Sequence, residues 1–182
     1  MANPEHVAEL TPLDRWTVGL YRGGLCVGAF ALAALAGTFG AELDPVWARW
    51  AVLAAVGLIA ADLHLYDPTI RWIIGAAGWT GAVLTAIPLH GGVAAWVHDA
   101  GLGFLFVVFS AVALKERMCF RLPVVVLVPP LLAGALVPMR VGFAPLAAGP
   151  LALAAAVFAL LAVAKLRMPA HYDIGDKSRY QV

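Results

Sequence analysis

Six apolar runs, each about as long as a membrane-crossing helix, follow one another along this chain. They cover approximately residues 17–39, 46–66, 69–89, 93–114, 122–139 and 143–164. A helix needs about 20 predominantly apolar residues to cross the hydrocarbon core of a bilayer. The pattern predicts an all-α polytopic membrane protein, a bundle of six transmembrane helices. Residues 17–167 form its transmembrane domain, and residues 1–16 and 168–182 form two polar tails.

The composition excludes several classes of protein. Hydrophobic residues make up 63% of the chain and charged residues 13%, against about 45–50% and about 25% in soluble domains. The formal net charge is +1, which gives no electrostatic attraction to nucleic acid. We therefore expect a lipid bilayer as the surroundings of this chain, no nucleic-acid partner and no soluble catalytic domain.

The basic residues predict the orientation of the bundle. If both termini lie in the cytoplasm, ten of the twelve Lys and Arg residues fall on the cytoplasmic side, and Arg49 and Arg140 fall on the outer side. An excess of Lys and Arg in short cytoplasmic loops is the usual determinant of membrane topology. The charge count therefore predicts that both termini are cytoplasmic.

Two ionisable residues lie inside the first two runs. Arg22 follows the start of the first run by one turn, and Asp62 precedes the end of the second. At 1.5 Å per residue both lie roughly 6–8 Å deep from the cytoplasmic side, so adjacent antiparallel helices would bring them to one level. Two interpretations stay open: a buried ion pair that locks the helices, or a proton or cation site. An ion pair would by itself offset the free energy that the two buried charges lose on leaving water.

Two histidines and an aspartate lie near the outer side in the predicted topology. His90, His98 and Asp99 could ligate a metal ion at the outer surface, although interfacial histidines are more often solvated. A membrane haem needs two histidines at matched depth on facing helices, and His64 has no such partner. We therefore expect no cofactor.

A double proline, Pro129-Pro130, lies near the centre of the fifth run. Each proline lacks a backbone N–H and clashes with the preceding turn of a helix. The pair therefore predicts a kink or local unwinding of the fifth helix.

The end of the fourth run carries charges next to a cysteine. Lys115 and Arg117 suit a helix C-terminus that faces anionic lipid headgroups, but this explanation does not account for Glu116 between them. Cys119 follows closely, and basic neighbours can make a thiol reactive. With no nearby histidine or second cysteine in the sequence, we do not expect nucleophilic catalysis here.

Four local patterns together suggest a family. They are Tyr21-Arg22, His64-Leu65-Tyr66, Lys115-Glu116 with Cys119-Phe120, and the tail Asp173-Ile174-Gly175-Asp176-Lys177-Ser178. From Tyr21 to Lys177 the chain resembles the bacterial and cyanobacterial integral membrane proteins of domain-of-unknown-function family 2301. The resemblance implies a multi-pass protein of the bacterial cytoplasmic (inner) membrane. It brings no activity, substrate or cofactor, so no catalytic residue is assigned.

In the predicted topology all four patterns lie on the cytoplasmic side. This predicts one polar cluster there, composed of Arg22, Asp62, His64, Tyr66, Lys115, Glu116, Arg117, Cys119, Asp173, Asp176 and Lys177. We expect the tail to fold back on the bundle. Asp173 or Asp176 would then contact a basic residue of the loop between the fourth and fifth helices, and Ile174 would pack on the bundle.

Two functions of different classes fit these observations. The first is a non-enzymatic accessory, assembly or scaffold subunit of a membrane complex, because the sequence contains neither paired carboxylates deep in the membrane nor a cofactor motif. The alternative is a transporter of a small solute or ion. In that case Arg22, Asp62 and Glu116 would line a cytoplasmic vestibule, and Pro129-Pro130 would form a gating break.

Overall fold

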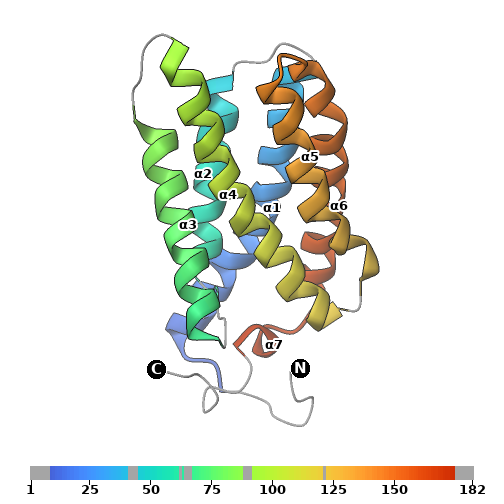
Figure 1. Cartoon of the computed structure of the whole chain (residues 1–182). Helices are drawn as coiled ribbons and strands as arrows, with labels where there is room; N and C mark the ends of the chain where they lie inside the picture. Colours follow the sequence, from blue (N-terminus) through green and yellow to red (C-terminus); the bar gives the residue numbers. More distant parts are fainter. Residues whose placement is uncertain are drawn as a thin grey trace.

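The computed structural model of the chain describes residues 9–40, 45–61, 63, 67–87, 92–120 and 122–174. All regular structure in these residues is helical. Figure 1 shows the long helices side by side, with α1 near the middle of the bundle and α3 at one edge. The expected all-α class is therefore confirmed.

Each of the six long helices overlaps one of the predicted apolar runs. The bounds are α1 Pro12–Gly40, α2 Pro45–Ala60, α3 Pro68–Ala86, α4 Gly92–Phe120, α5 Val128–Arg140 and α6 Ala148–Leu166. Two 3-10 helices, η1 Pro123–Leu127 and η2 Ala144–Ala147, precede α5 and α6, and the short α7 His171–Ile174 follows α6. α1 and α4 extend beyond the apolar runs, because a helix can continue into the polar region outside the lipid.

Four helical segments are long and apolar enough to cross a membrane, by length and composition, among the described residues. They are Pro12–Gly40, Trp96–Met118, Pro123–Arg140 and Ala144–Leu166. Val46–Ala60 in α2 is a shorter apolar helix. Large apolar side chains also point outward, such as Phe30 with 69% and Leu160 with 58% of their surface exposed. Apolar exposure on this scale is expected where lipid covers a protein.

Local sequence explains where two of the helices begin. Before α1, the Thr11 hydroxyl accepts a hydrogen bond from the Asp14 N–H, and the Asp14 carboxylate accepts one from the Thr11 N–H. This reciprocal arrangement is a capping box. The Asp67 carboxylate accepts hydrogen bonds from the N–H groups of Thr69 and Ile70. Pro68 then fills the first position of α3, where its missing N–H costs nothing.

The double proline lies at a change of helix type. η1 passes into α5 at Val128, and Pro129 and Pro130 occupy the first turn of α5. In a first turn the backbone N–H groups have no partner inside the helix, so prolines are tolerated there. The unwinding that the sequence predicts therefore takes the form of a 3-10 turn before the prolines, and not a break in mid-helix.

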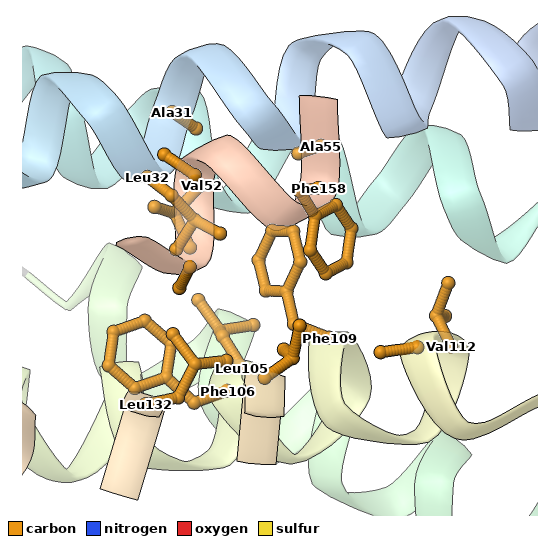
Figure 2. Packing of buried hydrophobic residues seen from close by; sticks show 14 of the residues in the cluster. Ala31, Leu32, Val52, Ala55, Leu105, Phe106, Phe109, Val112, Leu132 and Phe158 are labelled. Carbon is orange, nitrogen blue, oxygen red and sulfur yellow. The ribbon is translucent and has the colours of Figure 1, made fainter. Parts of the chain in front are cut away.

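Buried aromatic rings fill the space between α1, α4 and α6. The rings of Phe109 and Phe158 meet edge to face, with centroids 5.0 Å apart and planes at 75°. Figure 2 shows these two rings between Ala31 and Leu32 on one side and Leu105 and Val112 on the other. α1 packs most extensively on α2 and α6, whereas α3 packs mainly on α4.

Glycine permits the close approach of α1 to α2. A Cβ added at Gly24 would lie 2.7 Å from the backbone nitrogen of Ile59, whereas a Cβ at the adjacent Gly23 would meet nothing within 4 Å. Small residues commonly allow this contact in lipid, where helices gain nothing from burying apolar surface against each other. The absence of a side chain at Gly24 is therefore a packing requirement.

This contact makes a testable prediction. Gly24→Ala should lower the free energy of unfolding by about 1–3 kcal/mol, because the new methyl group overpacks the α1–α2 contact. Gly23→Ala is the matched control and should raise it by up to about 1 kcal/mol, because alanine favours the helix. Thermal unfolding in detergent, followed by circular dichroism, measures both. Equal effects of the two substitutions would contradict the close approach.

Candidate functional site

Ionisable side chains from four helices meet at one end of the bundle. This is the end where α1 begins, where α4 and α6 end, and beneath which α7 lies (Figure 1). The side chains are those of Tyr21, Arg22, Lys115, Glu116, Lys165 and Asp173. We call this group the buried charge cluster. It is the candidate functional site, since buried ionisable groups in membrane proteins are costly and often have a role.

Glu116 of α4 is the most enclosed member of the cluster. Its side chain has no exposed surface. The Tyr21 hydroxyl of α1 donates a hydrogen bond of 2.5 Å to Oε1, and Nζ of Lys165 from α6 lies 2.8 Å from Oε2. Nζ of Lys115 lies 3.8 Å from Oε1. Both carboxylate oxygens therefore have partners, as a buried charge requires.

Asp173 of α7 joins the cluster from below. Its Oδ2 accepts a hydrogen bond of 2.7 Å from Nε of Arg22 and lies 2.6 Å from Nη2 of the same guanidinium. Its Oδ1 forms an ion pair with Nζ of Lys165. Lys165 thus bridges Glu116 and Asp173, and one ammonium group connects α4, α6 and α7. Because Arg22 belongs to α1, the same carboxylate also ties α7 to the first helix.

The Tyr21 ring adds a second kind of contact. The Lys115 ammonium lies 4.7 Å, and that of Lys165 5.6 Å, from the centroid of the ring. A cation within about 6 Å of an aromatic face is attracted by the ring quadrupole. Tyr21 therefore stabilises the cluster in two ways, through its hydroxyl on Glu116 and through its ring on two lysines.

The structure brings four of the predicted cluster residues together: Arg22, Lys115, Glu116 and Asp173. Arg117 is exposed on α4, and Cys119 belongs to the last turn of that helix. The remaining candidates, which are Asp62, His64, Tyr66, Asp176 and Lys177, lie outside the described residues. For them membership of the cluster stays a prediction.

Two further members, Tyr21 and Lys165, are not among the residues that the sequence predicts for the cluster. Tyr21 occurs in the pattern Tyr21-Arg22, and Lys165 directly follows the sixth apolar run. The sequence nevertheless contains a signal for Lys165. The buried side of α6 runs through Leu151, Ala154, Phe158 and Leu161 to Lys165 at intervals of three or four residues. A lysine that continues the apolar face of a helix is placed to point inward.

The expected partner of Arg22, Asp62, lies outside the described residues, and the structure pairs Arg22 with Asp173. The expected packing of Ile174 is confirmed, since only 2% of its surface is exposed. Among the described residues, the basic partners of Asp173 belong to α1 and α6, because α7 follows α6 within a few residues and turns directly under the bundle. Arg121, in the loop after α4, and Asp176 lie outside the described residues, so the contact expected with that loop stays a prediction.

Two of the candidate metal ligands, His98 and Asp99, make other contacts in the structure. Nη1 of Arg49 lies 2.8 Å from Nδ1 of His98, and Nε2 of His98 lies 3.2 Å from the carbonyl oxygen of Ile87. Arginine has no acceptor, so Nδ1 accepts and Nε2 donates. Asp99 pairs with Arg140. His90 lies outside the described residues, within which no three His, Cys, Asp or Glu side chains group as metal ligands.

A surface hollow of about 430 Å³ lies on α3. Its lining consists of Pro68, Arg71, Trp72, Gly75, Ala76 and Trp79. All of these belong to α3, and none is a member of the buried charge cluster. The hollow therefore gives no access to Glu116.

The bridging position of Lys165 makes a testable prediction. Lys165→Met should lower the free energy of unfolding by about 3–5 kcal/mol, because it leaves two buried carboxylates without their shared cation. Lys115→Met is the matched control and should cost about 1 kcal/mol or less, because this ammonium is farther from Glu116 and more exposed. The double variant Lys165→Met with Glu116→Gln should recover part of the loss. Melting temperatures in detergent measure these effects, and a similar loss for both lysines would refute the bridging role.

Comparisons with known proteins agree with a membrane location of this chain. It is 30% identical to a protein of Haemophilus influenzae named as an uncharacterized protein, and the match covers all of both chains. No solved structure matches the chain. The family described as uncharacterized integral membrane proteins, DUF2301, matches residues 53–182. By this match and the relationship to the Haemophilus protein, the chain belongs to that family of integral membrane proteins.

Proposed function

We propose that this protein is a non-enzymatic accessory, assembly or scaffold subunit of a complex in the bacterial cytoplasmic membrane. The observation that carries the proposal is that the buried charged side chains at the cluster are engaged with one another. Glu116 is held by Tyr21 and Lys165, and Asp173 by Arg22 and Lys165. Such an arrangement fixes the helices relative to one another, as expected for a structural role.

Catalysis or transport would make different demands on these carboxylates. A general acid or base needs contact with a substrate, and a carboxylate in an ion path needs access to water. Glu116 has no exposed side-chain surface, and the side chain of Asp173 is 1% exposed. The transporter alternative would require Glu116 to become accessible to water, whereas the scaffold role is compatible with a Glu116 that stays enclosed, as it is here.

The proposal includes the topology. Six crossings with both termini in the cytoplasm would place the buried charge cluster at the cytoplasmic end of the bundle. The excess of basic residues on that side supports this orientation. The start of α1 lies at the same end of the bundle as α7 (Figure 1), which supports a common side of the membrane for the two termini.

Labelling of introduced cysteines tests the orientation. In a chain with Cys26→Ala and Cys119→Ala, the cysteine of Ser178→Cys should be protected from a membrane-impermeant maleimide in intact cells. The cysteine of Asp44→Cys, the matched position on the other side, should react. Both should react once the cells are lysed. The reverse pattern in intact cells would overturn the proposed topology.

Purification tests the role as a subunit. A tagged chain expressed at its natural level and isolated in a mild detergent should bring a membrane partner in fixed stoichiometry, seen by native mass spectrometry. Lys165→Met should lose this partner if the locked bundle is what the partner recognises, and Lys115→Met should keep it. A chain that purifies alone and moves a solute across reconstituted vesicles would favour the transporter and overturn the scaffold role.

A further inference from the structure

The segment that supplies Asp173 to the buried charge cluster is short. α7 has four residues, and its buried side chains are those of Asp173 and Ile174. The other two, His171 and Tyr172, are half-buried, and their rings lie against each other with centroids 4.4 Å apart and planes tilted by 35°. Among the described residues, the attachment of α7 to the bundle therefore depends mainly on one carboxylate and one aliphatic side chain. A contact of this size can open without unfolding the helices around it.

The two basic residues that bind Asp173 belong to longer helices. Arg22 lies in α1 and Lys165 in α6, and both remain in place if α7 moves. The guanidinium places Nε and Nη2 within 2.7 Å of one oxygen of Asp173, while the ammonium of Lys165 faces the other oxygen. A guanidinium and an ammonium that converge from two sides match a planar carboxylate. Removal of Asp173 would leave three cations of the cluster, Arg22, Lys115 and Lys165, with one carboxylate, that of Glu116.

We propose that Arg22 and Lys165 form a carboxylate-binding site whose resident ligand is Asp173, and that this ligand is exchangeable. α7 then acts as a plug that an acidic side chain of a partner protein displaces. The identity of the competing group rests on the proposed function as a subunit, whereas the carboxylate site itself does not. A tethered ligand acts at an effective concentration of about millimolar or above, so a free carboxylate must exceed that concentration to compete.

Removal of the resident ligand tests the site, with acetate as the probe. Asp173→Ala empties the site, and the isosteric Asp173→Asn does so with less change of shape. Sodium acetate at about 100 mM, compared with sodium chloride at the same ionic strength, should raise the melting temperature of either variant by at least about 2 °C. The wild type, whose site is filled, and the double variant Arg22→Ala with Asp173→Ala should not respond. No gain from acetate in either single variant would overturn the proposal, as would a larger gain from phosphate.

Displacement of the plug needs a second measurement. In a chain with Cys26→Ala, Cys119→Ala and Ile174→Cys, the new thiol reports the opening of α7 because residue 174 is buried. Acetate should increase its rate of maleimide labelling severalfold over chloride at equal ionic strength. Adding Arg22→Ala should abolish this acetate effect. Labelling that is insensitive to acetate would show that Asp173 is a permanent part of the cluster and would overturn the exchange. Neither measurement involves a partner, so their failure is distinct from failure of the subunit role.

Discussion

The contacts of Lys165 are the interaction on which one end of this bundle depends. Its ammonium is shared by Glu116 and Asp173, and only 2% of its side chain is exposed. A buried charge that loses its partner costs several kcal/mol, because nothing replaces the water that it gave up. The positions of α4, α6 and α7 at this end therefore depend on one another: a shift of α4 or α6 would separate Glu116 from Lys165, and a shift of α7 would separate Asp173 from Lys165.

Close packing along the rest of the bundle holds the helices in the positions that these ion pairs require. In lipid there is no hydrophobic gain from bringing helices together, so van der Waals contact must hold them. Gly24 admits Ile59 of α2, and Gly28 lies where a Cβ would be 2.8 Å from the ring of Phe109. These two glycines set the position of α1 against α2 and α4. The same helix carries Tyr21 and Arg22 into the cluster, so the packing of α1 also determines the geometry of the charges.

The cluster has two parts with different attachments. Tyr21, Glu116 and Lys165 come from α1, α4 and α6, which are long helices with extensive packing. Asp173 comes from a four-residue helix after the last long one. In the proposed function the first part is a lock within the bundle. Through the second part, displacement of α7 can affect the contact of Lys165 with Glu116, because Lys165 contacts both carboxylates.

The sequence by itself determined the all-helical class and the membrane surroundings, because hydrophobic length and periodicity are local properties of the chain. It also indicated the end of the bundle where Arg22, Lys115, Glu116 and Asp173 gather, since charges at helix ends follow from the order of the apolar runs. It did not determine which charges pair: the structure joins Arg22 to Asp173, 151 residues away, whereas Asp62, the partner expected from the sequence, lies outside the described residues. Only the tertiary structure decided this pairing and the inward position of Lys165. Pairing depends on the rotation and depth of each helix, and these are set by contacts such as that of Gly24 with Ile59, which no single segment contains.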